Sequence, residues 1–378
     1  MNLLLRLLFL FQSLPVFVPQ SAFKLLEKLL SKCIWQNKRP RVHLKILMSD
    51  KENGGLRLPN IKMYYWAAQI RAIVAWIIGD PETMWVSVEE ESVPGISLFS
   101  LPFIGLETQK KMKIENVWIK HTLKVWNQVQ KQSRGVVALS RAMSIRRNIE
   151  FLPSLADSGF DRWPESKLIT VNQLFEGNVV KTFAQLRNNF NLPSKDHYRC
   201  LQIRNYLTKH KDWDQLRREP TNIENHFIHL SENSGVMKKQ VSLIYHKLLM
   251  DVSDNTQNIK QQWEMELNVI LDDDTWGNVC PDCHKGVGSQ MWKEFDWKTK
   301  IRFFRTPLES FCCGSWGSGM CWRNCGLVGD QTHISWDCPI LHHFLTEVKG
   351  LIDKLLKANL TYSLMICPKI TGFYCISC

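Results

Sequence analysis

The sequence predicts a mainly α-helical protein with a small cysteine-rich region near its C-terminal end. Apolar residues recur at three- and four-residue spacing in several segments, as they do on one face of an α-helix. Glycine and proline separate these segments, and ten of the twelve cysteines lie in residues 280–378. The chain has 378 residues and is 44% hydrophobic, which is enough for a packed core and for two or three domains.

The first 18 residues permit two interpretations. Arg6 within an apolar run resembles the start of a secretory signal peptide. The alternative is a truncated internal helix whose methionine now serves as the start. Gln12, Ser13 and Pro15 interrupt the run, and no stretch reaches the ~20 apolar residues of a membrane span. We therefore predict no stable membrane span.

Two further helices are predicted before residue 79. Ser21 is a suitable N-cap for a helix over residues 21–36, where apolar residues follow at helical spacing. The turn Asn53-Gly54-Gly55 lets the chain reverse, because glycine accepts positive φ. A second helix over residues 60–78 has few charges, so we expect it to be buried on most sides.

The later segments also show helical periodicity. The segment 107–131 has an apolar face with Trp118, Leu123 and Trp126, and it has lysines on its other side. Pro193 marks the end of one helix, and either Ser194 or Asp196 is suited to cap the next. The helices predicted after residue 131 cover residues 170–176, 180–190, 196–209 and 289–305.

Basic charge is concentrated near the N-terminal end. The chain has 48 Lys and Arg against 36 Asp and Glu, a net charge of +12. Residues 1–47 hold eight basic groups and one acid. Such a block suits a polyanion, either nucleic acid or a membrane surface, and the alternative is an ordinary solvated face. The residues predicted to contact phosphates are Lys38, Arg39, Arg41, Lys45, Arg302 and Arg305.

The strongest candidate site is the cysteine box Cys321-x₃-Cys325-x₇-His333-x₄-Cys338. Three thiolates and one imidazole form a common tetrahedral Zn²⁺ site. The segment is too short for its own apolar core, so zinc would supply most of its folding free energy. The alternatives are cysteines that only pack, or an incidental disulfide.

Three residues inside the box suit contacts with nucleic acid. Trp322 and Trp336 are suited to stack on unpaired bases, and Arg323 to contact a phosphate. The alternative is that Trp322 and Trp336 both bury against a neighbouring helix.

A second cysteine pair, Cys280-Pro-Asp-Cys283, lacks a clear second half unless Cys312 and Cys313 provide it. Free thiols are the favoured interpretation of these residues. His342 and His343 are expected at the surface rather than as ligands.

Several motifs, in the same order along the chain, resemble LINE-type non-LTR retrotransposon reverse transcriptases. They begin just after that family's catalytic palm and cover most of residues 1–350. The matching motifs, in chain order, are Trp35-Gln-Asn-Lys-Arg-Pro-Arg-Val, Gly54-Gly-Leu-Arg-Leu-Pro-Asn with Tyr64-Tyr-Trp-Ala, Phe151-Leu-Pro-Ser-Leu-Ala-Asp-Ser-Gly-Phe with Trp163, Tyr198-Arg-Cys-Leu-Gln-Ile-Arg204, Trp297 to Pro307, and the cysteine box.

The resemblance implies a domain organisation and a function. The four parts are a thumb-like helical region (1–78), a helical connector (79–270), an amphipathic helix with a zinc knuckle (271–345) and an unplaced tail (346–378). The implied partners are RNA and DNA, with no small-molecule substrate, and the implied cofactor is zinc. The implied location is intracellular, in the nucleus or cytoplasm. Helices that normally pack on the palm would expose apolar surface and favour aggregation.

The catalytic centre of that family is absent from the sequence. Nucleotidyl transfer uses a carboxylate pair that holds two metal ions, and the family carries it in an aromatic-Ala-Asp-Asp motif. The only adjacent aspartates here, Asp272 to Asp274, have no such context. We therefore predict that the chain is not an enzyme.

A rival hypothesis is a secreted, disulfide-linked protein with a cleaved signal peptide. The even number of cysteines permits it. Cysteines clustered with histidine in a chain this long instead favour metal binding in a reducing compartment.

Overall fold

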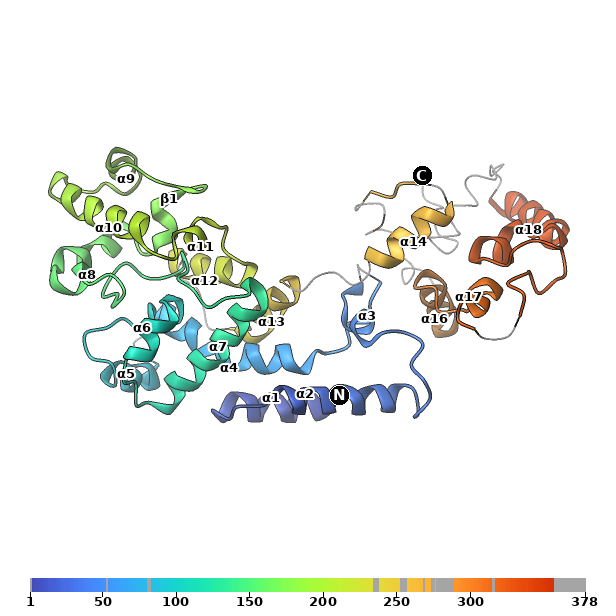
Figure 1. Ribbon diagram of the computed structural model, residues 1–378, viewed down its shortest axis with the longest axis horizontal. Helices are drawn as coiled ribbons and strands as arrows, with labels where there is room; N and C mark the ends of the chain where they lie inside the picture. Colours follow the sequence, from blue (N-terminus) through green and yellow to red (C-terminus); the bar gives the residue numbers. More distant parts are fainter. Residues whose placement is uncertain are drawn as a thin grey trace. The chain divides into compact units, whose positions relative to one another are not determined.

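The computed structural model describes residues 2–51, 54–79, 83–233, 238–251, 257–267, 269–272, 276, 289–314 and 317–356. Over these residues the protein is mainly helical, which confirms the predicted fold class (Figure 1). The chain forms two compact units. Unit 1 consists of Met1–Lys24 and Asn60–Ser253, and unit 2 of Leu25–Pro59 and Asp254–Cys378. This division does not follow the predicted boundary at residue 78.

Unit 1 contains most of the helices and both described strands. Its two strands pair antiparallel, with Phe175 opposite Val180. The elements of unit 1 are α1 (Asn2–Ser13), the start of α2 (Gln20–Ile34), α4 (Ile61–Ile78), α5 (Met84–Glu91), η2 (Leu101–Phe103), α6 (Leu106–Lys111), α7 (Val117–Arg134), α8 (Pro153–Ala156), η3 (Ser158–Ser166), η4 (Val171–Leu174), β1 (Phe175–Glu176), β2 (Val179–Val180), α9 (Phe183–Phe190), η5 (Ser194–Asp196), α10 (His197–Lys209), α11 (Trp213–Arg217), α12 (Asn222–Glu232) and α13 (Gln240–Met250).

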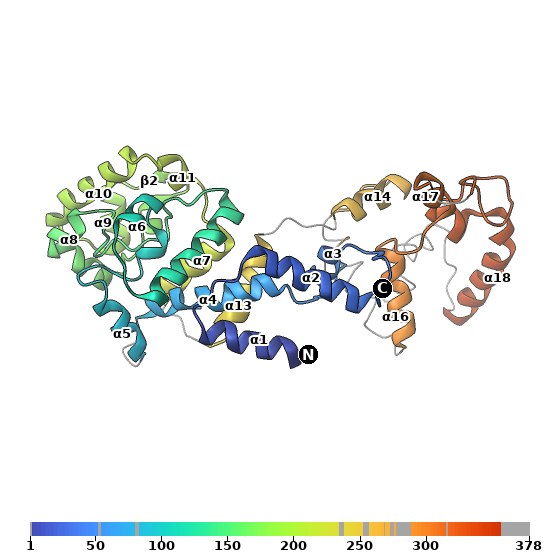
Figure 2. The same cartoon turned by 60° about the horizontal axis from the view of Figure 1, so that its bottom comes forward.

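Helix α4 is the centre of unit 1, as its apolar sequence predicts. It packs against α13, α7, α1 and α12, and Figure 2 shows α1, α7 and α13 beside it. Asn60 begins the helix by accepting a hydrogen bond from Met63 N, and Gly79 ends it at φ 60°. The polar groups of α4 hold α1 in place, because Gln69 Nε2 donates to the carbonyl oxygens of Phe11 at 2.5 Å and Leu14 at 3.1 Å.

Three predicted helices differ from the structure. The segment 107–131 forms two helices, because Asn116 caps a new one by accepting hydrogen bonds from the amides of Trp118 and Ile119. The helix predicted over residues 170–176 is wrong, since that segment is a short 3₁₀ turn leading into β1. The helix predicted over 289–305 ends at Lys300.

Unit 2 contains α3 (Leu44–Met48), the rest of α2, α14 (Gln257–Leu267), α16 (Gln290–Lys300), α17 (Pro307–Cys312), the π-helical turn η7 (His333–Asp337) and α18 (Pro339–Leu356). Its core joins segments from both ends of the sequence, with Val42 and Leu47 packed among Trp263, Trp276 and Ile301. Two tryptophans in this unit also have hydrogen-bonded indoles. Trp263 Nε1 donates to Lys300 O, and Trp297 Nε1 donates to Gly54 O, both at 2.9 Å.

The turn at Gly54 and Gly55 reverses the chain as predicted. Gly54 adopts φ 78°. A Cβ on Gly55 would lie 1.9 Å from the carbonyl oxygen of Ser49, so only glycine fits there. Asn53 lies outside the described residues.

Among the described residues, no helix combines the length and apolar character needed to cross a bilayer.

Candidate metal centre

The four residues of the cysteine box converge on one point in unit 2. One donor atom from each of Cys321, Cys325, His333 and Cys338 lies within 4.8 Å of every other. Cys321 Sγ and Cys338 Sγ are 3.9 Å apart, and Cys325 Sγ is 3.1 Å from His333 Nε2. The box therefore brings together the predicted donor set.

A small hairpin positions the first two cysteines. Met320 and Val328 form an antiparallel bridge, and Cys321 N donates to Leu327 O at 2.9 Å. The three residues between Cys321 and Cys325 include Asn324, which adopts a left-handed conformation with φ 54°. Asparagine tolerates this conformation better than most residues do. The three-residue spacing is therefore accommodated inside a tight turn.

The π-helical turn η7 positions His333. Asp330 Oδ1 accepts hydrogen bonds from His333 N at 2.7 Å and from the Thr332 hydroxyl at 3.0 Å. Arg323 Nη1 donates to Ile334 O at 2.9 Å and so ties the hairpin to this turn. His333 is 6% exposed. These contacts thus hold the His333 imidazole close to the thiols of the three cysteines.

Cys338 immediately precedes α18. Burial alone would raise the pKa of its thiol, but hydrogen bonds from the amides of Ile340 and Leu341 and from the neighbouring cysteines lower that pKa below its ordinary value. Amides at a helix N-terminus stabilise a thiolate in this way. For Cys325, burial and hydrogen bonds with Cys321 and Cys338 raise the pKa of the thiol, against the opposing effect of the Leu327 amide.

The donor set fits a zinc ion. With Zn–S bonds of ~2.3 Å, two sulfur ligands of one tetrahedral ion lie roughly 3.8 Å apart, close to the distance between Cys321 Sγ and Cys338 Sγ. Cys321 and Cys338 are 3% and 0% exposed, and Cys325 is half-buried. A closed Cys₃His set of this kind is typical of structural rather than catalytic zinc, which keeps an open position for water.

Helix α17 buttresses the hairpin through Gly329. A Cβ at this position would lie 2.6 Å from Pro307 Cγ and 3.1 Å from Cys321 Cα. Leu308 N donates to Gly329 O at 3.2 Å. This close approach at Gly329 was not predicted, because a lone glycine outside a turn gives no signal for it in the sequence.

The two tryptophans of the box differ in exposure. Trp322 is 63% exposed, whereas Trp336 is half-buried. The alternative that both rings bury is therefore wrong for Trp322.

The basic residues predicted to contact phosphates differ in exposure. Five of them are exposed, namely Lys38, Arg39, Arg41, Lys45 and Arg305.

Arg302 is the exception, and the structure corrects its assignment. Its side chain is 8% exposed and forms ion pairs with Glu266 and Glu309. It also lies over the Trp263 ring, 5.2 Å from the centroid. Burial works against its charge, but the hydrogen bond and attraction of Glu266 raise the pKa of Arg302. Arg302 thus stabilises the core of unit 2, and a phosphate cannot replace these partners without exposing it.

An aromatic contact beside the basic segment was not predicted. Phe303 stacks on Trp35 with ring centroids 6.2 Å apart. The Arg41 guanidinium lies 5.3 Å from the Phe303 centroid, and Lys298 Nζ lies 5.0 Å from it. The contact joins residues far apart in sequence, which no local pattern reveals.

The remaining cysteines and histidines give no second cluster within the described residues. Cys280 and Cys283 lie outside that part of the chain, as do Asp273 and Asp274. Cys312 and Cys313 are exposed free thiols. His342 and His343 are exposed, as predicted. None of the seven described cysteines forms a disulfide.

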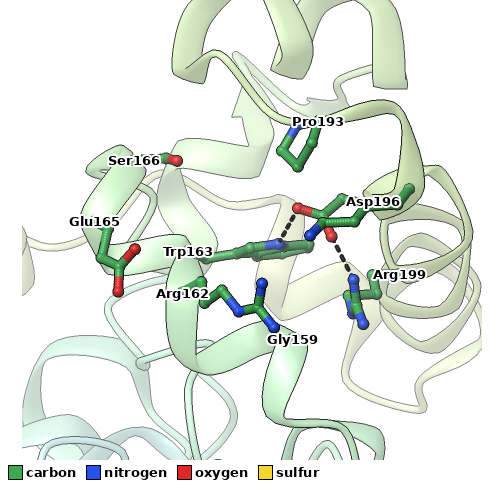
Figure 3. Close-up of a pocket in the computed structure, with 9 residues that line it drawn as sticks. Gly159, Arg162, Trp163, Glu165, Ser166, Pro193, Asp196 and Arg199 are labelled. Atoms are coloured by element: carbon green, nitrogen blue, oxygen red, sulfur yellow. Dashed lines mark hydrogen bonds and ion pairs between the residues drawn. The ribbon is translucent and has the colours of Figure 1, made fainter.

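A separate pocket of about 330 Å³ lies in unit 1 (Figure 3). Trp163 lines it, and its Nε1 donates to Asp196 Oδ2 at 3.2 Å. Three basic and two acidic side chains line it. Arg199 is already bound by Asp157 and Asp196. The charges on its walls nearly cancel.

No protein-family model matches the sequence.

Proposed function

We propose that this chain is a non-catalytic nucleic-acid-binding protein that derives from the C-terminal part of a LINE-type reverse transcriptase and folds around a structural zinc ion. The observation that carries the proposal is the convergence of four zinc-type donors within 4.8 Å. The ordered motifs in the sequence support the origin.

Zinc would be held by Cys321, Cys325, His333 and Cys338, and it would supply folding free energy rather than reactivity. In the free chain these donors are joined mainly by one short hairpin and one π-helical turn. Such a small element has little apolar material of its own, so we expect it to order when the metal binds.

Exposed groups of unit 2 support the proposal that the chain binds single-stranded nucleic acid. Trp322 offers an exposed ring beside the metal site, and stacking on such rings is tolerant of sequence. Lys38, Arg39, Arg41, Lys45 and Arg305 add positive charge in the same unit. Binding through these groups would be weak and would fall steeply with salt, because it releases counterions from the phosphates.

The metal assignment is tested by measuring zinc in the purified full chain. We expect Cys321→Ser and His333→Ala each to lose one equivalent of zinc relative to the parent. Cys312→Ser is the matched control, because Cys312 is an exposed thiol outside the cluster, and it should keep the full content. Equal zinc content in all four proteins would refute the assigned ligands.

The binding assignment is tested by fluorescence anisotropy with a labelled single-stranded RNA over a range of salt. The double variant Lys38→Gln/Arg39→Gln should bind more weakly and lower the slope of log K against log salt by roughly one to two. Lys110→Gln/Lys111→Gln removes the same charge from exposed lysines of unit 1 and should change neither. Equal loss in both pairs would show that only net charge matters and would contradict a defined surface.

A further inference from the structure

Helix α2 exposes a row of leucines beside a row of lysines. Leu25 and Leu29 are 57% and 52% exposed, and Lys28 and Lys32 are exposed next to them. Each pair is four residues apart, so each row follows one side of the helix. The two rows are adjacent, because Leu25 and Lys28 are three residues apart, as are Leu29 and Lys32.

The apolar residues on the opposite side of α2 are less exposed. Phe23 is buried, and Leu26 and Leu30 are half-buried. The helix therefore has more apolar surface than the fold covers. The exposed leucines are contiguous rather than scattered, and contiguous exposed apolar surface marks an interaction site more often than single exposed residues do.

The charge of α2 selects the kind of surface that can cover this face. Its 15 residues contain three lysines, including Lys24, and one acid, Glu27. A partner must therefore accept aliphatic side chains and present negative charge within a few ångströms of them. The boundary between acyl chains and phosphate headgroups in an anionic membrane has both properties, and lysine side chains reach from the apolar layer to the headgroups.

Nucleic acid matches the lysines but not the leucines. Single-stranded bases stack on aromatic rings, and leucine has no such face. The exposed aromatic ring lies instead at the metal centre, at Trp322. The composition of the exposed face of α2 thus separates it from the surface assigned above to nucleic acid.

We propose that α2 binds peripherally to anionic lipid membranes, with Leu25 and Leu29 among the acyl chains and Lys28 and Lys32 at the phosphate headgroups. Helix α1 shows the same combination on a smaller scale, with exposed Leu5 and Phe9 one turn apart beside the exposed Arg6. This association requires no membrane span.

The experiment is co-sedimentation of the full chain with vesicles of phosphatidylcholine alone or with ~30 mol% phosphatidylserine. Each lysine near an anionic surface strengthens binding roughly fivefold. We therefore expect Lys28→Gln/Lys32→Gln to bind phosphatidylserine vesicles about twentyfold or more weakly. Leu25→Gln/Leu29→Gln keeps the charge and should reduce binding at least as much. Leu201→Gln, at an exposed leucine of α10, is the matched control and should bind like the parent.

Four outcomes would overturn the proposal. The first is failure of the parent chain to sediment with phosphatidylserine vesicles. The second is equal sedimentation with neutral and anionic vesicles. The third is binding that depends on the lysines but not on the leucines, together with competition by single-stranded RNA, which would assign the face to nucleic acid. The fourth is loss of binding in the Leu201→Gln control, which would indicate a non-specific effect. Far-UV circular dichroism of each variant establishes that α2 remains folded.

Discussion

Arg199 binds the carboxylate of Asp157 through two hydrogen bonds, from Nε to Oδ2 at 2.6 Å and from Nη2 to Oδ1 at 2.8 Å. The guanidinium passes directly over Gly159, where a Cβ would lie 2.0 Å from Arg199 Cζ. Asp157 and Arg199 come from two separate motifs of the resemblance, so this pair joins them physically.

The pair makes part of the stability of unit 1 dependent on pH. The hydrogen bond from Arg199 lowers the pKa of Asp157, so the folded state prefers the ionised carboxyl. Its contribution is present above the ordinary aspartate pKa of about 4 and is lost as pH falls through the lower folded value. Asp157→Asn should lower the urea midpoint at pH 7 and lower it less at pH 3. A midpoint difference that is the same at both values would contradict this account.

Gly329→Ala should disrupt the metal centre. The new methyl group would meet the rigid ring of Pro307 and the backbone of Cys321, and forced overpacking typically costs about 1–3 kcal/mol. Gly350→Ala is the control, because a Cβ there meets nothing within 4 Å and alanine favours a helix by up to about 1 kcal/mol. Competition with a chromophoric chelator should show weaker zinc binding for Gly329→Ala and unchanged binding for Gly350→Ala. The reverse order would contradict the packing argument.

Asn324 should tolerate glycine but not valine. Its φ of 54° costs a residue with a Cβ roughly 1–2 kcal/mol of conformational free energy. Glycine adopts this φ without that cost, whereas the cost is largest for a β-branched residue. The same chelator competition should place Asn324→Gly at or above the parent in zinc affinity and Asn324→Val below it. Equal affinities for both variants would show that the turn relaxes when zinc binds.

Arg302 and Arg305 should separate stability from binding. Arg302→Gln removes the cation that pairs with the half-buried Glu266 carboxylate. Leaving such a group without its partner typically costs about 1–3 kcal/mol of stability, so this variant should lower the thermal midpoint of unit 2. Arg305→Gln removes an exposed charge and should leave that midpoint nearly unchanged while weakening RNA binding. For each variant, the thermal midpoint is measured by tryptophan fluorescence and RNA binding by fluorescence anisotropy on the same protein preparation. Similar thermal midpoints for the two variants would refute the distinction.

The sequence predicted those features that local spacing determines. The apolar periodicity of α4 and the spacing of the cysteine box are both visible within about 20 residues, and the structure has a helix and a donor cluster there. The 175–180 hairpin was missed because two-residue strands are too short to show alternation. Arg302 and Arg305 look alike in sequence, and only the packing of Trp263 and Glu266 from a distant segment buries one of them.

The core of unit 2 also sets an order of events during synthesis. Val42 and Leu47 leave the ribosome early, but Ile259, Trp263 and Ile301, which cover them, emerge more than 200 residues later. Unit 1 can close in the interval, since domains generally fold as units while the chain grows. Until translation passes Ile301, a nascent chain therefore presents Val42 and Leu47 to chaperones. A chain truncated before residue 259 lacks the residues that cover Val42 and Leu47, so both side chains stay exposed in it.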